Sequence, residues 1–195
     1  MPVTHYILRH GQTDWNAEWR LQGQQDIPLN ETGRQQARDN GRRLKALAGN
    51  LDGHDFVASP LGRARETMEL ARGSAGLDPL AYRIDERLKE ICFGDWEGFT
   101  GREIKKTDPE RHRERQLKKW DFVPPGDLAE SYEILSWRVG SWLKSLDRPT
   151  VAVCHGGVIR CIFKLVGGVS REDAAQLDIP QDRVLVHDGA RLEWA

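Results

Sequence analysis

Three short, wholly apolar segments constrain the fold of this chain more than any other feature. They are residues Tyr6–Leu8, Phe56–Ala58 and Val151–Cys154, and a helical pattern follows each of them. A strand that is apolar on both faces is buried on both faces, which is typical of parallel strands covered by helices. The sequence therefore predicts an α/β fold with helices on both sides of a parallel sheet.

The stretches after the first two strands carry helix-start signals. Asn30 is placed to cap a helix that runs to about Leu47, with Ala37, Gly41, Leu44 and Leu47 on one face. Ser59 followed by Pro60 predicts an N-cap and the first helical position of a second helix.

The C-terminal half predicts two more helices and a hairpin. Asp127 and Glu130 match a capping box ahead of an apolar stripe with alternating spacings of four and three. The stripe consists of Leu128, Tyr132, Leu135, Val139, Trp142 and Leu146. Residues 158–166 are predicted to form a helix that ends at a pair of glycines. Residues 183–187 and 191–194 are predicted to form a terminal hairpin.

Length and composition favour one domain over residues 1–195. Residues 100–126 form a polar, cation-rich insertion that fits a lid over the scaffold; the alternative is a solvated helix that contacts nothing. Oligomeric state cannot be deduced from the pattern. The three cysteines, an odd number at spacings of neither a disulfide framework nor a zinc site, are expected to be reduced.

Charge and hydropathy exclude several classes of partner. The formal net charge of −1 predicts no general affinity for nucleic acid or an anionic membrane. No apolar stretch reaches the roughly 20 residues needed to cross a bilayer, and the N-terminal residues lack the regions of a signal peptide. We therefore expect a cytoplasmic protein whose anion binding is local.

Cationic and titratable side chains follow the predicted strands. Arg9 and His10 end the first strand, His155 ends the third, and Arg63 lies in the first turn of the helix after the second. Ligands bind outside the carboxyl ends of strands in open α/β sheets, and helix N-termini there favour anions. A single phosphate group explains all four residues.

These residue types indicate phosphoryl transfer. A neutral imidazole is a nucleophile toward phosphorus, and arginine matches phosphoryl oxygens while staying charged, so no metal is required. Glu90, beside a glycine-rich apolar turn, could donate the proton that the leaving oxygen needs; the alternative is a surface carboxylate paired with Lys89 or Arg87. Cys154 lies on the opposite face of its strand from His155, so a cysteine hydrolase is not favoured.

Five ordered blocks resemble the histidine phosphatase superfamily, also called the phosphoglycerate mutase-like family. They are residues 8–16 with the Arg-His-Gly signature, 21–23 with 26–33, 59–67, 88–98, and His155-Gly156-Gly157. The resemblance covers most of the chain. It implies a three-layer α/β/α fold with a mostly parallel six-stranded sheet, and no metal or other cofactor.

The resemblance also implies roles for individual residues. His10 is the expected nucleophile that becomes phosphohistidine, and Glu90 the expected general acid. The residues expected to bind the phosphoryl group or line its pocket are Arg9, Asn16, Gln22, Gly23, Arg63, His155 and Gly156. Asn16 and Gln22 have an alternative interpretation as loop staples, because amides commonly serve that purpose.

Three functions remain open at this point. Glu90-Ile91-Cys92-Phe93 and the glycine pair after His155 depart from the pattern usual in true mutases and resemble the phosphatase branch. The prediction is a metal-independent hydrolase of a small phosphorylated metabolite. The alternatives are a phosphoglycerate mutase, which alone would need 2,3-bisphosphoglycerate, and a non-catalytic phosphate-binding module.

Overall fold

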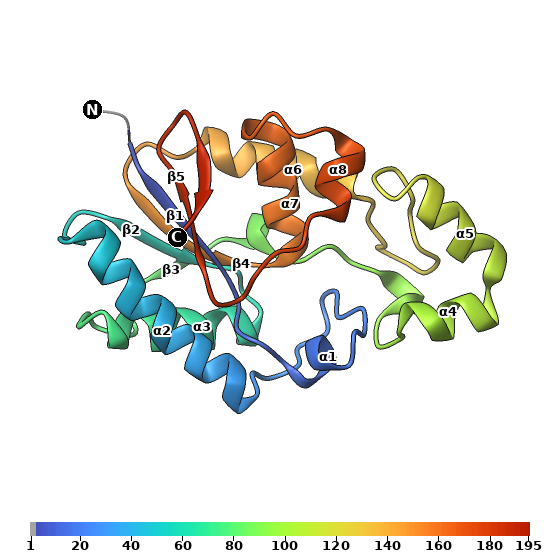
Figure 1. The fold of residues 1–195 in the computed structure, drawn as a ribbon, viewed down its shortest axis with the longest axis horizontal. Helices are drawn as coiled ribbons and strands as arrows, with labels where there is room; N and C mark the ends of the chain where they lie inside the picture. Colours follow the sequence, from blue (N-terminus) through green and yellow to red (C-terminus); the bar gives the residue numbers. More distant parts are fainter. Residues whose placement is uncertain (1–2) are drawn as a thin grey trace.

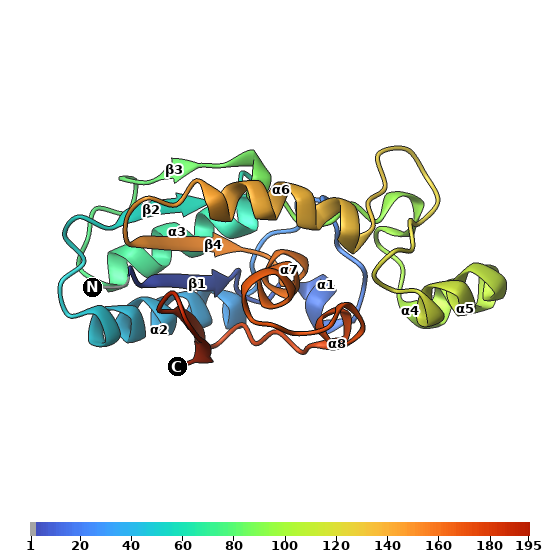
Figure 2. The same cartoon turned by 90° about the horizontal axis from the view of Figure 1, so that it is seen from above.

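The strands expected from the apolar segments form the centre of one sheet. The computed structural model describes residues 3–195, and these form a sheet of strand order β3-β2-β4-β1-β5-β6. The strands are β1 (His5–Arg9), β2 (Asp55–Ala58), β3 (Arg83–Ile84), β4 (Thr150–Cys154), β5 (Val184–His187) and β6 (Leu192–Trp194). β4 pairs in parallel with β1 and β2, and β2 pairs in parallel with β3 (Figure 2). β5 pairs antiparallel with β1 on one side and with β6 on the other. The predicted α/β fold with a mostly parallel sheet is confirmed.

Helices cover both faces of the sheet. The helix bounds are α1 (Asp14–Ala17), α2 (Glu31–Ala48), α3 (Gly62–Ser74), α6 (Tyr132–Lys144), α7 (Gly156–Val166) and α8 (Arg171–Gln176), with short 3₁₀ turns η1 (Glu86–Leu88) and η2 (Gly94–Trp96). α2 and α3 lie against one face, and α6 and α7 against the other (Figure 1). The three layers are those that the sequence predicts.

Alternation along β1 explains how one strand serves both layers. Successive side chains of a strand point to opposite faces of its sheet. Ile7 packs into the apolar cluster that contains Leu135 of α6, while Leu8 packs into the cluster that contains Leu44 of α2. Both strand residues are fully buried, as a strand covered on two sides requires.

Helix α2 and the terminal hairpin lie where the sequence places them. The Oδ1 atom of Asn30 accepts a hydrogen bond from the N–H of Gly33 (2.9 Å), which caps α2. β5 and β6 form the predicted hairpin. Leu47, expected on the buried face of α2, is instead 42% exposed.

The predicted start of α3 is wrong by two residues. The helix begins at Gly62, its N-cap is Leu61, and Ser59 makes no cap. The Ser59 hydroxyl instead lies 2.7 Å from Nε2 of His155. Asp26, from a distant loop, accepts the Gly62 N–H (2.8 Å) in place of a local cap.

The predicted start of α6 is also wrong. Ser131 caps the helix by accepting the N–H of Ile134 (3.2 Å). Asp127 and Glu130 therefore lie outside the helix, and Leu128, expected on the buried stripe, is 89% exposed. The side chain of Glu130 is used in a tertiary ion pair instead of a cap.

α7 begins earlier than predicted. His155 is its N-cap, and both following glycines belong to its first turn. The predicted C-terminus is confirmed, because α7 ends at Val166 with Gly167 as C-cap. The backbone N–H groups at the start of α7 are thus directed at the sheet edge where β4 ends.

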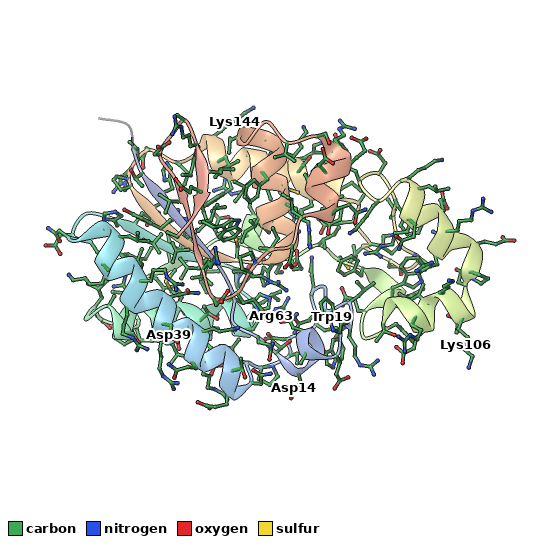
Figure 3. All side chains as sticks on the ribbon, viewed as in Figure 1. Asp14, Trp19, Asp39, Arg63, Lys106 and Lys144 are labelled. Atoms are coloured by element: carbon green, nitrogen blue, oxygen red, sulfur yellow. The ribbon has the colours of Figure 1, made fainter. Side chains whose placement is uncertain are left out.

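The insertion forms two short helices that project from the body of the molecule. They are α4 (Gly101–Thr107) and α5 (Pro109–Leu117), and a loop leads from them to α6 (Figures 1 and 2). Lys106 extends into solvent, whereas Arg63 lies inside the body (Figure 3). A lid function for the insertion stays a prediction. Within residues 3–195, no helix has both the length and the apolar character that a membrane span requires.

Candidate active site

The carboxyl ends of three neighbouring strands meet at one edge of the sheet. β1 and β2 flank β4, so the strand ends at Arg9, Ala58 and Cys154 lie side by side. His10 follows β1, and its backbone N–H donates to the carbonyl of Cys154 (2.9 Å). His155 follows β4. Segments far apart in the sequence are therefore brought together as the sequence predicts.

Two contacts orient the ring of His10. Nδ1 lies 2.8 Å from the carbonyl oxygen of Gly11, which can only accept a hydrogen bond, so the proton is assigned to Nδ1. Nε2 is then unprotonated, and it accepts a hydrogen bond from Nε of Arg63 (3.3 Å). The ring thus presents a lone pair on Nε2 beside a guanidinium group.

The second histidine faces the first. The ring centroids of His10 and His155 lie 5.0 Å apart at an interplanar angle of 56°. Nε2 of His155 contacts the Ser59 hydroxyl, and its buried Nδ1 has no hydrogen-bond partner among residues 3–195. Both imidazoles therefore contribute to one site.

Burial and cationic neighbours keep both imidazoles neutral. Desolvation, then the charges of Arg63 and Arg9, hold the pKa of His10 well below its ordinary value. Desolvation, then Arg63 and His10, act in the same direction on the pKa of His155. A neutral imidazole is the nucleophilic form.

Backbone carbonyls hold the two arginines. Arg9 donates from Nη1 to the carbonyl of Ile179 (2.6 Å), and its buried Nε has no partner in the described part of the chain. Arg63 donates to the carbonyls of Gln25 (2.6 Å) and Gly23 (2.7 Å). Each guanidinium is therefore fixed without neutralisation by a carboxylate.

The two guanidinium groups stay charged at neutral pH. Burial lowers the pKa of Arg9 to about 10, with a further contribution from Arg160, and burial lowers the pKa of Arg63 to about 10. Two desolvated cations that lack ion-pair partners within residues 3–195 attract an anion strongly. This supports the predicted phosphoryl site.

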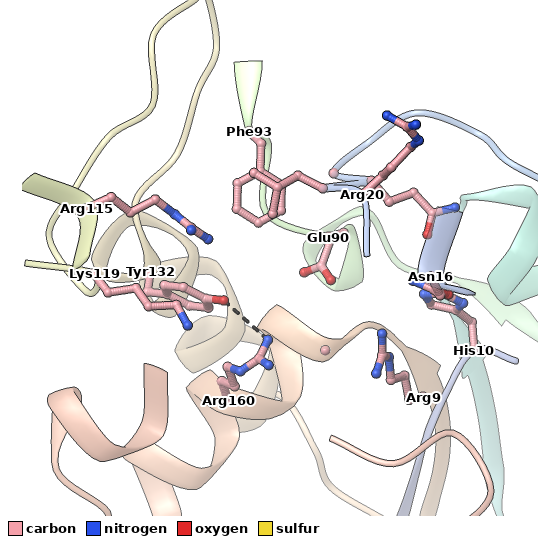
Figure 4. Close-up of a pocket in the computed structure, with 14 residues that line it drawn as sticks. Arg9, His10, Asn16, Arg20, Glu90, Phe93, Arg115, Lys119, Tyr132 and Arg160 are labelled. Atoms are coloured by element: carbon pink, nitrogen blue, oxygen red, sulfur yellow. Dashed lines mark hydrogen bonds between the residues drawn. The ribbon is translucent and has the colours of Figure 1, made fainter. Parts of the chain in front are cut away.

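Glu90 lies across the cavity from Arg9 (Figure 4). Its Oε1 accepts the N–H of Ile91 (2.9 Å) and that of Gly157 in the first turn of α7 (3.0 Å). Lys89 and Arg87, its partners under the surface-carboxylate alternative, pair with other carboxylates. The carboxyl group is thus presented to the cavity, as its predicted role requires.

Asn16 and Gln22 line the cavity and also staple loops. Oδ1 of Asn16 accepts from the N–H of Thr13 (3.2 Å) and from Nε2 of Gln181 (3.1 Å). Nε2 of Gln22 donates to the Thr13 hydroxyl (3.1 Å), while its buried Oε1 is unpartnered among residues 3–195. Both interpretations of these amides therefore hold together.

Of the two predicted glycines, Gly23 is required by close approach, whereas Gly156 has room for a Cβ. Gly23 has a φ of +54°, and a Cβ there would lie 1.9 Å from Oε1 of Glu97. A Cβ on Gly156 would lie 3.4 Å from Nη1 of Arg160 and 3.6 Å from Nε of Arg9. The absence of a side chain at Gly156 leaves the space between these two cations open.

Most of the predicted site residues line a cavity of about 230 Å³, whereas Arg63 and His155 adjoin His10 without being among its lining residues. Glu90 is the one carboxylate among the residues that the structure places around it, and several are cations (Figure 4). The lining residues are Arg9, His10, Asn16, Arg20, Leu21, Gln22, Gly23, Glu90, Phe93, Arg115, Lys119, Tyr132, Gly156 and Arg160. A neighbouring cavity of about 590 Å³ shares Arg9 and Arg160 with it.

Sequence reasoning missed the end of the cavity opposite His10. Arg160 of α7 donates to the hydroxyl of Tyr132 (3.3 Å), and the sequence pattern marks neither as a site residue. Arg115 and Lys119 of the cation-rich insertion reach the same end (Figure 4). Arg160 lies one helical turn after Gly156, so this spacing was the available signal. Burial, then the charges of Arg160 and Arg115, lower the pKa of Lys119 to about 8.

The cysteines take no part in this arrangement. All three are free thiols, and burial raises the pKa of Cys154. Among residues 3–195, no group of three or more His, Cys, Asp or Glu side chains is arranged to hold a metal ion.

Comparison with known proteins identifies the family. The model of the histidine phosphatase superfamily (branch 1) matches residues 5–194. The chain belongs to the histidine phosphatase superfamily. A probable phosphoglycerate mutase GpmB of Citrobacter koseri is 36% identical over 173 residues, which span 84% of this chain and 74% of that protein.

Two solved structures of similar sequence share the fold. The protein TTHB049 from Thermus thermophilus has a TM-score of 0.73 at 34% identity, over 97% of this chain and 96% of that one. A mycobacterial glucosyl-3-phosphoglycerate phosphatase has a TM-score of 0.78 at 28% identity, over 100% and 97%. The chain is thus similar both to a protein named as a probable mutase and to one named as a phosphatase.

Proposed function

We propose that this protein is a metal-independent phosphomonoester hydrolase that acts through a phosphohistidine at Nε2 of His10 on a small phosphorylated metabolite. The observation that carries the proposal is the state of the His10 ring. Its Nδ1–H is held by the Gly11 carbonyl, so the lone pair on Nε2 faces the site beside Arg63. A nucleophile prepared in this way needs no separate base.

The reaction has two steps. Nε2 of His10 bonds to phosphorus as the ester oxygen leaves, and Glu90 gives that oxygen its proton. Glu90 then takes a proton from a water molecule, whose oxygen bonds to phosphorus as the N–P bond breaks. Arg9, Arg63 and His155 compensate the charge on the phosphoryl oxygens throughout.

The cations opposite His10 support a substrate with a second anionic group. Arg115, Lys119 and Arg160 have no carboxylate within ion-pair distance among residues 3–195, and Arg160 is held by the Tyr132 hydroxyl. Half-buried cations without ion-pair partners repel one another and are partly desolvated, so an arrangement of three is explained by an anion that binds between them. A carboxylate or a second phosphate would satisfy it.

The alternative is a phosphoglycerate mutase. The name of the Citrobacter koseri relative favours it. The sequence after Glu90 and the glycine pair after His155 favour the hydrolase. A mutase would convert 3-phosphoglycerate to 2-phosphoglycerate with stimulation by 2,3-bisphosphoglycerate, whereas a hydrolase would release inorganic phosphate and need no such activator.

A cytoplasmic location stays a prediction from the sequence.

The decisive experiment measures turnover of p-nitrophenyl phosphate in the presence of EDTA, with trapping of an acid-labile phosphoprotein. Unaltered protein should turn over and form the adduct, and His10→Ala should do neither. His112→Ala, a change on α5 outside the cavity, is the matched control and should keep both activities. Equal activity in His10→Ala would end the proposal, and phosphate binding without turnover would indicate a binding module.

A further inference from the structure

Arg138 of α6 reaches the backbone of the segment that carries Glu90. Nη1 donates to the carbonyls of Arg87 (2.8 Å) and Lys89 (2.6 Å), and Nη2 donates to the carbonyl of Glu90 (3.0 Å). The side chain is 21% exposed, so these bonds are largely shielded from water. One guanidinium therefore fixes three carbonyls at and immediately before the proposed acid.

Glu130 completes a clamp around the same segment. Its carboxylate accepts from Nε (3.0 Å) and Nη2 (2.8 Å) of Arg138, a two-bond fork of the strong, charge-assisted kind. Oε2 also accepts the N–H of Cys92 (3.0 Å), and the N–H of Glu130 donates to the Cys92 carbonyl (2.9 Å). The pair thus holds the chain on both sides of Glu90.

The segment needs such anchors because it has no regular structure of its own. Residues 89–93 belong to no helix or strand. Their buried polar groups therefore need partners from other segments, and here these come mainly from α6 and the stretch just before it. Gln24, from the loop near Gly23, adds one bond to the Glu90 carbonyl (3.1 Å). The Arg138–Glu130 pair contacts the backbone both at Glu90 and beyond it at Cys92.

We propose that Arg138 and Glu130 are positioning residues that aim the Glu90 carboxyl at the leaving oxygen. This inference rests on the proposed function. Neither side chain lines the cavity, so neither touches substrate. They act through the backbone that they hold. Transfer of a proton in the transition state requires the carboxyl within hydrogen-bond reach of that oxygen, which a loosened segment would not guarantee.

Leaving-group chemistry separates positioning from general structural support. p-Nitrophenolate leaves with little proton assistance, whereas the alkoxide of glycerol 2-phosphate leaves only when protonated. Arg138→Met and Glu130→Gln should therefore slow phosphohistidine formation from glycerol 2-phosphate by about tenfold or more. This is part of the roughly 10²- to 10⁴-fold rate acceleration that a general acid supplies. The burst of p-nitrophenol from p-nitrophenyl phosphate should stay within about twofold of the unaltered rate, because His10, Arg9 and Arg63 are untouched.

The controls distinguish the possible failures. Arg148→Met removes an exposed arginine that pairs with Asp147 far from the cavity, and both rates should stay unchanged. Glu130→Gln keeps the shape of the clamp, so it tests the role even where Arg138→Met does not fold. A proportional loss for both substrates, or no loss, would overturn the positioning role alone. Absence of any turnover of p-nitrophenyl phosphate by the unaltered protein would refute the phosphatase assignment and this role with it.

Discussion

At the level of single residues, the site depends on keeping an imidazole neutral among cations. Arg63 donates to Nε2 of His10, and this contact both orients the ring and opposes its protonation. Charged neighbours that bind phosphate therefore also preserve the nucleophile. The two requirements of phosphohistidine chemistry, an anion site and an unprotonated Nε2, are met by the same contact.

The buried imidazoles should not titrate in the ordinary range. Desolvation and nearby guanidinium groups lower the pKa of both His10 and His155, so neither ring should gain a proton as pH falls from 8 through 6.5. Long-range ¹H–¹⁵N NMR spectra would show constant ring shifts, with the proton of His10 on Nδ1. A protonation step near pH 6.5 at either ring would contradict this description of the site.

Substitution of Gly157 should displace the proposed acid. A Cβ there would lie 2.3 Å from Oε1 of Glu90 and 3.1 Å from Leu135, so Gly157→Ala pushes the carboxylate from its place. Turnover of an alkyl phosphate should fall by about 10- to 100-fold, within the range for loss of a general acid. Gly140→Ala is the control, because its Cβ would be 3.8 Å from its nearest neighbour and should stabilise α6 by up to about 1 kcal/mol. Equal turnover in both variants would exclude the displacement.

Residues at strand ends were predictable, and those that depend on tertiary packing were not. Arg9, His10 and His155 follow apolar strands, and the direction of parallel strands alone places them at one edge. Arg160 and Tyr132 carry no such signal, because a cation on one helix and a phenol on another become neighbours only when α6 packs on α7. The same holds for Arg138, which contacts backbone 51 residues earlier in the chain.

At the level of elements, a helix start was predictable when its capping residue lies next to the helix in the sequence. Asn30 caps α2 from the adjacent position, and its prediction is confirmed. The N-terminus of α3 takes its acceptor from Asp26, 36 residues away, while Ser59 serves His155. A cap that comes from a distant loop leaves no local pattern, so the prediction at Ser59 was wrong.

The α5 end of the insertion should select substrates by their second charge. Removing two cations with Arg115→Met and Lys119→Met in one variant should raise the KM for a substrate that carries an additional carboxylate or phosphate. We expect about tenfold or more, since hydrogen bonds to charged groups contribute about 1.5–3 kcal/mol each.

The same variant should hydrolyse a substrate without a second anionic group as efficiently as the unaltered protein does. kcat/KM for p-nitrophenyl phosphate should change by no more than about twofold, because the phosphoryl end is distant from α5. Lys105→Met with Lys106→Met, two exposed residues of α4, removes the same charge away from the cavity. Equal effects of the two double variants would indicate that general electrostatics, and not a subsite, governs binding.

At the level of the whole molecule, one sheet order assembles the site. β4 lies between β1 and β2, so residues near positions 10, 60 and 155 share one edge. The cost of this assembly is the desolvation of imidazole and guanidinium groups in a folded protein. Stability and function therefore respond to the same buried groups.

Acid should destabilise the fold through its buried histidines. Desolvation lowers the pKa of His10, His155, His5 and His187 in the folded state, while unfolded histidine titrates near its ordinary 6.5. Below about pH 6.5 the unfolded chain binds protons that the native protein does not, so the free energy of unfolding falls with pH. Urea unfolding should be measured at pH 7.5, 6.5 and 5.5, and the free energy of unfolding should decrease progressively at pH 6.5 and 5.5. His5→Gln should reduce that slope, because it removes one such group away from the cavity. A free energy of unfolding that stays constant or rises from pH 7.5 to 5.5 would mean that the imidazoles are not held neutral by the fold.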